Sequence, residues 1–202
     1  MHTSDLNLPI SLRPVLVSDI DMYRAFLAEL SPGTVYFRFG RLSTPAFTDE
    51  QLREICSPDP RKLVSFVATT NGLNAQRIVG TARMEHDIAA NAWEFTIVVS
   101  DEFQGNGLGR RLMHHLMGEA SRRGVKLLYG DVLPSNHNML GFCQALGFQV
   151  GSCARDERLC RLEFDLSKSM PKATSDQRDE ATGIASLVKI KKTTRPNLRS
   201  LS

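Results

Sequence analysis

The stretch Gln104-Gly105-Asn106-Gly107-Leu108-Gly109-Arg110 lies between an apolar run that ends at Ser100 and a segment in which leucine recurs every four residues, from Leu108 to Leu116. That recurrence predicts a helix that begins within the glycine-rich stretch. Glycines let the backbone approach a ligand closely, and the unpaired N–H groups and the dipole of a helix start attract phosphate oxygens. We therefore expect this turn to bind an anionic group at the junction of a strand and a helix.

Two other phosphate-binding loops can be compared with this turn. A Walker loop ends in Gly-Lys followed by Ser or Thr, whereas Gly109 is followed here by two arginines. A dinucleotide-binding Rossmann site has the spacing G-x-G-x-x-G after an N-terminal strand, whereas the spacing here is G-x-G-x-G and lies late in the chain. Both sites are disfavoured, which leaves a glycine-rich connection without a ligand as the alternative.

Three runs rich in β-branched and aromatic residues precede the turn, at 63–70, 77–85 and 93–100. The short polar segments between them predict an antiparallel meander of three strands. Further upstream, a first strand is expected at 10–13. Capping residues there predict three helices, which begin at Ser18, at Ser31-Pro32 and, with a capping box, at Thr48.

The part of the chain after the helix predicts a strand at 127–133, a helix at 136–146 and two further strands near 148–153 and 159–166. A strand, helix, strand unit thus lies inside an otherwise antiparallel order. This order is typical of the α+β class and not of a doubly wound fold.

Composition fits one globular domain with appendages. The chain has 202 residues, 42% of them hydrophobic, and a mean hydropathy of −0.20, and no apolar run approaches the roughly 18 residues of a membrane span. The first nine residues lack an apolar signal segment, so we expect a flexible N-terminus and a cytoplasmic protein without membrane contact. The net charge of +3 comes from residues 168–202, in which 8 Lys and Arg stand against 3 Asp and Glu. We expect a disordered basic tail there, favoured over a nucleic-acid contact.

The four cysteines, Cys56, Cys143, Cys153 and Cys160, form no C-x-x-C pair and have no histidine at the spacing of a zinc site. In a chain without an export signal they are expected to be reduced thiols, each acting as a small core residue. No metal site is predicted.

The glycine-rich turn and its surroundings resemble the GNAT superfamily of acyl-CoA N-acyltransferases. The matching residues are Gln104, Gly107 and Gly109 for the family motif Q/R-x-x-G-x-G/A, Ile97 to Glu102 for the apolar strand end and acidic turn, Asn136 for the family's asparagine, and Gly147-Phe148 for its terminal Gly-Phe. The resemblance covers about residues 10–166. It implies one GNAT domain at 10–167, built on a mixed, mostly antiparallel sheet of six to seven strands flanked by helices.

A narrower resemblance is to the acetyltransferase domain of bacterial protein-lysine acetyltransferases. The matching stretches are Leu30-Ser31-Pro32, Tyr36 to Phe39, Ile78 to Arg83, Trp93-Glu94-Phe95, and Val132-Leu133 with Asn136, Met139 and Gly147-Phe148. This match is less specific than the superfamily match. It favours a protein lysine as the acceptor over a small-molecule amine.

The resemblance implies an acetyl-CoA site. In it, the backbone of Ile97, Val98 and Val99 would hold the pantetheine arm, the loop Gln104, Gly105, Asn106, Gly107, Leu108, Gly109 and Arg110 would hold the pyrophosphate, and Asn136 and Met139 would bind further along the cofactor. A splayed V between the strand ending at Val99 and the strand ending at Leu133 would admit the thioester.

Attack of an amine on a thioester requires the neutral amine, so a base is needed to remove a proton. Glu94 is the candidate: it matches the glutamate of the resembled lysine acetyltransferases, and its apolar neighbours would raise its pKa. A solvent-facing strand residue is the alternative for Glu94, and Asp131 on the next strand is a weaker candidate base. Many family members have a tyrosine as general acid where this chain has Cys143, which is either that acid or a core thiol.

The acceptor site is less well defined by the sequence. Residues 36–41 could shape its mouth, with Arg38 and Arg41 attracting an acidic substrate, or they could form a helix that packs Phe37 and Phe39 into the core. Two functions follow: an acetyl-CoA-dependent N-acetyltransferase, which could form a homodimer, or a catalytically silent acyl-CoA-binding sensor or scaffold. The position of Glu94 relative to the acceptor cleft discriminates between them.

Overall fold

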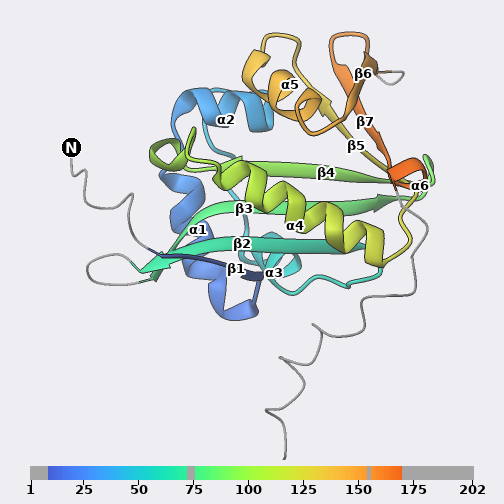
Figure 1. Cartoon of the computed structure of the whole chain (residues 1–202). Helices are drawn as coiled ribbons and strands as arrows, with labels where there is room; N and C mark the ends of the chain where they lie inside the picture. Colours follow the sequence, from blue (N-terminus) through green and yellow to red (C-terminus); the bar gives the residue numbers. More distant parts are fainter. Residues whose placement is uncertain (1–8, 72–75, 154–155, 170–202) are drawn as a thin grey trace, which may run out of the picture. The chain divides into compact units, whose positions relative to one another are not determined.

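The computed structural model describes residues 9–71, 76–153 and 156–169. Nearly all of the expected flexible N-terminus and of the expected basic tail lies outside these residues. The described part carries a seven-stranded sheet with helices on both faces, as predicted (Figure 1).

The strands of the sheet follow the order β1-β2-β3-β4-β5-β7-β6. Their bounds are Ile10–Pro14 for β1, Leu63–Asn71 for β2, Gln76–Asp87 for β3, Ala92–Val99 for β4, Leu127–Val132 for β5, Gln149–Ser152 for β6 and Cys160–Asp165 for β7. All neighbours are antiparallel except β4 and β5, which are parallel. The predicted meander is confirmed as β2-β3-β4, and the predicted mixed α+β arrangement follows from the single parallel pair.

The helices divide between the two faces of the sheet. Their bounds are Ile20–Ala28 for α1, Pro32–Phe39 for α2, Asp49–Cys56 for α3, Leu108–Arg122 for α4, His137–Gln144 for α5 and Leu166–Ser169 for α6. In Figure 1, α4 crosses in front of the sheet, and α1 and α3 lie behind it. None of the helices in the described ranges has the length and apolarity that crossing a membrane would require.

Each face of the sheet has its own core. The leucines of α4 are fully buried against residues such as Ala82, Met84 and Phe95 of the sheet. On the other face, Phe26 of α1 and Leu52 of α3 pack with strand residues that include Val98. Because side chains alternate along a strand, β4 contributes Phe95 to the first core and Val98 to the second. This alternation decides which face of β4 each polar residue occupies.

Local capping explains where two of the N-terminal helices begin. Ser31 Oγ accepts a hydrogen bond from Thr34 N at 3.2 Å, Pro32 occupies the first turn of α2, and Gly40 ends the helix at a φ of 66°. Thr48 and Gln51 form the predicted capping box of α3. These two helix starts are confirmed.

The predicted start of α1 at Ser18 is wrong. Residues Val17–Asp19 form a 3₁₀ turn, labelled η2, and α1 follows at Ile20. The carboxylate of Asp19, and not the Ser18 hydroxyl, accepts a backbone hydrogen bond here, from Leu16 N at 2.8 Å. The same carboxylate also binds an arginine of β1.

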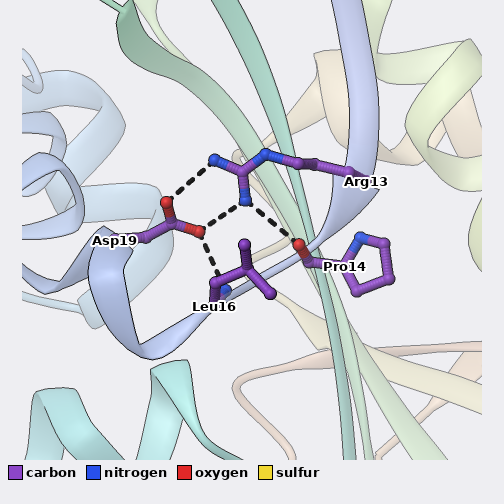
Figure 2. Close-up of polar contacts among 4 residues, drawn as sticks. All are labelled: Arg13, Pro14, Leu16 and Asp19. Atoms are coloured by element: carbon purple, nitrogen blue, oxygen red, sulfur yellow. Dashed lines mark hydrogen bonds and ion pairs between the residues drawn. The ribbon is translucent and has the colours of Figure 1, made fainter. Parts of the chain in front are cut away.

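That arginine is Arg13, which forms two hydrogen bonds with the Asp19 carboxylate, at 2.6 and 2.8 Å (Figure 2). Arg13 Nη1 also donates to the carbonyl of Pro14 at 3.1 Å. The Asp19 side chain is 2% exposed, and the Arg13 guanidinium holds the pKa of this carboxyl below its ordinary value. The pair therefore ties the first strand to the start of α1.

Asp19→Asn is expected to lower the free energy of unfolding at pH 7 by about 2–3 kcal/mol, because it leaves the partly buried guanidinium without its counter-charge. Since the folded-state pKa is depressed, the stabilisation is present above the ordinary carboxyl pKa and is lost as the pH falls through the lower, folded value. Urea unfolding at pH 7 and at pH 3 measures both effects. Arg24→Gln, which breaks an exposed pair with Asp49, should cost under about 1 kcal/mol; an equal loss in both variants would contradict the role of Asp19.

Candidate active site

The strands β4 and β5 separate at their carboxyl ends. Within this fully described part of the sheet they pair only at Trp93 with Leu128 and at Glu94 with Tyr129. Beyond Glu94, β4 stays paired with β3 as far as Val99, but its other edge has no strand partner. The backbone of 95–98 along this edge therefore has no strand partner, whereas the carbonyl of Val99 accepts a hydrogen bond from the side chain of Gln104.

The base of this splay is filled by the ring of Phe95. A Cβ added at Gly130 of β5 would lie 2.8 Å from a ring carbon of Phe95. A side chain at position 130 would therefore collide with the ring. The glycine lets the two strands stay close at the base while they diverge above it.

The glycine-rich turn follows a 3₁₀ turn after β4, labelled η3 (Asp101–Phe103), and leads into α4. Gly105 and Gly107 have φ values of 74° and 78°, in the left-handed region that favours glycine, and no atom lies within 4 Å of the position of an added Cβ at either residue. The first helical hydrogen bond of α4 runs from Arg111 N to Gly107 O at 3.1 Å. The N–H groups of 108–110 precede it and have no partner within the helix. The turn therefore presents an open backbone and several N–H donors at one helix start.

A network of side chains fixes this turn to α2. Asp101 accepts hydrogen bonds from the hydroxyls of Ser31 at 2.6 Å and of Thr34 at 2.8 Å. Gln104 Nε2 donates to the carbonyl of Val99 at 2.9 Å and to Thr34 Oγ1 at 3.3 Å. The side chain of Gln104 therefore positions the strand end and the turn, while the backbone of the turn stays open. The sequence did not reveal the contribution of Asp101, because its partners are about 70 residues away.

Glu94 lies half-buried on β4, on the opposite face from Phe95. Burial raises its pKa, and the negative charges of Asp131 and Glu85 raise it further, whereas Arg38 and Arg83 oppose the rise. The side chain therefore lies among charged groups of β3, β5 and α2. A carboxyl in these surroundings is a better proton acceptor than one in water.

Asp131, the weaker candidate base, is engaged elsewhere. Arg161 of β7 binds both oxygens of its carboxylate, with Nη2 to Oδ2 at 2.9 Å. Charge-assisted hydrogen bonds from a guanidinium therefore occupy both oxygens of the Asp131 carboxylate. Its charge acts instead on Glu94.

A cavity of about 290 Å³ opens on the same face of the sheet as Glu94. Arg38, Arg83 and Thr96 line it together with apolar residues such as Leu27 and Phe39. Of the two arginines predicted to attract an acidic substrate, Arg38 lines this cavity and Arg41 does not. The alternative of packing Phe37 into the core is wrong, because Phe37 is 43% exposed; Phe39 does pack against the second core.

Three further predicted site residues, two for the cofactor and one as a possible general acid, lie on or next to α5. Asn136 caps this helix, accepting a hydrogen bond from Met139 N at 3.2 Å, and Met139 packs against the main core. Cys143 is fully buried in that core, and burial raises the pKa of its thiol to about 12. The structure thus brings Glu94 and the glycine-rich turn to one splay and places the Cys143 thiol inside the core.

Comparison with known proteins agrees with this geometry. A sequence model described as the acetyltransferase (GNAT) family matches residues 27–148. The chain is 34% identical over 142 residues to acetyltransferase PA5475 of Pseudomonas aeruginosa, covering 69% of this chain and 74% of that protein. It is 29% identical over 104 residues to the ribosomal protein bS18-alanine N-acetyltransferase of Escherichia coli, covering 52% and 67%. The GNAT domain of S. lividans PAT superposes with a TM-score of 0.69 at 25% identity, covering 76% of this chain and 89% of that domain.

The residues present fit the cofactor of this family. Gly105 and Gly107 leave open space beside a helix start that attracts phosphate oxygens, and the unpaired edge of β4 offers backbone groups to an amide-containing arm. Gly109 has only ordinary contact distances, 3.8 Å to Phe142 and 4.0 Å to Val99. From the family match and this fit we conclude that the chain belongs to the GNAT family of acetyl-CoA-dependent N-acyltransferases.

Proposed function

We propose that the protein transfers an acetyl group from acetyl-CoA directly to a primary amine, with Glu94 as the general base. The observation that carries the proposal is the position of Glu94, half-buried beside the splay between β4 and β5, on the face that holds the cavity. A solvent-facing strand residue would not have its pKa raised by burial.

Each part of the site has a separate role in the proposed reaction. Bound acetyl-CoA supplies an activated thioester. The turn 104–110 and the open edge of β4 hold the cofactor, so that its reactive end lies within the splay. A lysine amine, with a pKa of about 10.4, is mostly protonated at neutral pH. Glu94 accepts this proton directly or through one water, which gives the amine the lone pair that attacks the thioester carbon.

The leaving thiolate requires no proton from Cys143 in this proposal. A thiol with a pKa of about 12 holds its proton more tightly than an ordinary thiol does, and CoA leaves as an ordinary thiolate. Cys143 therefore has a packing role. As the N–C bond forms and the C–S bond breaks, the nitrogen loses its second proton to water, and water protonates the thiolate.

We further propose a protein lysine as the first acceptor to test and the cytoplasm as the location. The acceptor follows from the resemblance to the acetyltransferase domain of bacterial protein-lysine acetyltransferases. The location is supported by the four cysteines, all of which are free thiols in the described part of the chain.

The test is thiol release from acetyl-CoA by the full chain, measured against a panel of lysine peptides and small amines after calorimetric titration with acetyl-CoA and with CoA. We expect binding of both and turnover with at least one acceptor. Tight binding without turnover on any amine would contradict catalysis and would favour an acyl-CoA sensor. Absence of binding would contradict the assignment of the glycine-rich turn.

A further inference from the structure

The cavity beside Glu94 carries two guanidinium groups. Arg83 Nε donates to Thr96 Oγ1 at 3.1 Å, and its nearest carboxylate oxygen, on the 61%-exposed side chain of Glu85, is 3.9 Å away. Arg38 lies over the ring of Phe39 at 4.9 Å, and no residue in the described ranges forms an ion pair with it. The cavity therefore holds two positive charges, and the acidic side chains that act on them, Glu85 and Glu94, lie outside its lining.

This arrangement is unfavourable for the protein without a ligand. Burial and the neighbouring charge of Arg83 together lower the pKa of Arg38 to about 10, although Tyr23 and Glu94 act in the opposite direction. Guanidinium groups that are partly desolvated and close together repel each other. An anion bound between them would relieve both costs, and a carboxylate matches the planar fork of a guanidinium.

The cavity also has a fixed relation to the general base. In the antiparallel pair of β3 and β4, Thr81 faces Val98, Arg83 faces Thr96, and Glu85 faces Glu94. Residues two apart on a strand share a face, so these pairs form successive rows on one surface. The row of Arg83 lines the cavity, and the row of Glu94 lies next to it, about 7 Å further along the strand.

We propose that the acceptor carries a carboxylate close to its reactive amine, and that Arg38 and Arg83 bind this carboxylate in the cavity while the amine lies toward Glu94. The inference rests on the proposed function, because it assigns the substrate class of the same site. The apolar walls, among them Leu27 and Phe39, accommodate the carbon skeleton of the acceptor. The carboxylate belongs either to a free amino acid or to an acidic side chain beside an acceptor lysine.

The experiment compares matched acceptors in two arms. One arm uses free amino acids and their α-carboxamides, and the other uses lysine peptides with Glu or Gln next to the lysine. We expect kcat/KM to favour the carboxylate member of the pair by about 10-fold or more in one arm, and that arm identifies the source. Equal rates for the charged and neutral members in both arms would overturn the inference and leave acetyl transfer intact.

Substitutions of the two arginines test whether the preference for a carboxylate acceptor arises in the cavity. Arg38→Gln and Arg83→Gln are each expected to lower kcat/KM for the carboxylate acceptor by about 10- to 100-fold and to leave the neutral partner unaffected, with Arg83→Lys intermediate. Arg53→Gln, which removes a positive charge from the exposed face of α3 outside the cavity, serves as the matched control. Equal loss for both acceptors, or an equal effect of the control, would contradict binding in the cavity.

A binding measurement separates this inference from the proposed function. The N-acetylated amino acid or acetylated Glu-Lys peptide contains the carboxylate but no amine to transfer to. We expect it to raise the melting temperature of the full chain and to lose this effect in Arg83→Gln, whose own melting temperature and circular dichroism report whether it folds. A raised melting temperature without turnover on any amine would contradict only the proposed function. An unchanged melting temperature, together with equal rates for carboxylate and neutral acceptors, would contradict the inference.

Discussion

Glu94→Gln is expected to lower kcat for amine acetylation by about 100- to 1,000-fold, because the amide has the shape of the carboxyl group but cannot accept a proton. The affinity for acetyl-CoA should stay within about twofold, since the glycine-rich turn proposed to hold the cofactor begins only after the end of β4 and does not include this side chain. Initial rates of thiol release at saturating acetyl-CoA, together with calorimetry, measure the two quantities separately.

The acetylation rate should depend on pH in a direction set by the pKa of Glu94. The acceptor proton is taken by ionised Glu94, so the rate should fall as the pH drops through the pKa of this carboxyl. Burial and the charges of Asp131 and Glu85 raise that pKa, so the fall should begin above the range of an ordinary glutamate. Glu85→Gln is the matched control, because it removes one of the raising charges and should move the acid limb to lower pH with kcat retained. An acid limb that persists unchanged in Glu94→Gln would contradict the role of Glu94 as base.

Gly107→Val is expected to weaken acetyl-CoA binding by about 10- to 100-fold. The residue has a φ of 78°, which a β-branched side chain adopts only with strain, and it precedes the first turn of α4. The turn must then rearrange, and the N–H groups at the helix start lose their common direction. Calorimetric titration with acetyl-CoA and with CoA measures the loss.

Gly118→Ala is the control for this variant. Gly118 lies on the exposed side of α4, and an added Cβ would have open space around it. Alanine there is expected to stabilise the helix by about 0.5–1 kcal/mol. It should leave cofactor affinity unchanged. Unaltered affinity in a folded Gly107→Val protein would show that the turn does not bind the cofactor.

The elements that could be predicted from sequence are those whose signals are local. Ser31-Pro32, the Thr48 capping box and the repeated leucines of α4 act within a few residues, and all three helices begin as expected. The start of α1 was missed because the deciding partner, Arg13, lies in a different element. The insertion of β7 between β5 and β6 likewise depends on pairing across the sheet, which no short pattern reports.

The candidate site likewise combines features with a local sequence signal and features that depend on distant elements. The glycine-rich turn is one continuous stretch, so its backbone could be recognised directly from the sequence. The cavity could not, because it combines residues of α1, α2 and α3 with two rows of β3 and β4 that meet only in the fold. The alternation along β3 did contain a usable signal: Thr81, Arg83 and Glu85 share one face, and the register with β4 puts that face beside Glu94.

A crystal structure of the full chain with acetyl-CoA tests the function most directly. We expect the pyrophosphate at the N–H groups of the turn 104–110, the pantetheine arm along the open edge of β4, and the thioester in the splay between β4 and β5, on a path to Glu94. Acetyl-CoA bound outside the splay, or with its thioester separated from Glu94 by the core around Phe95, would contradict direct acetyl transfer at this site.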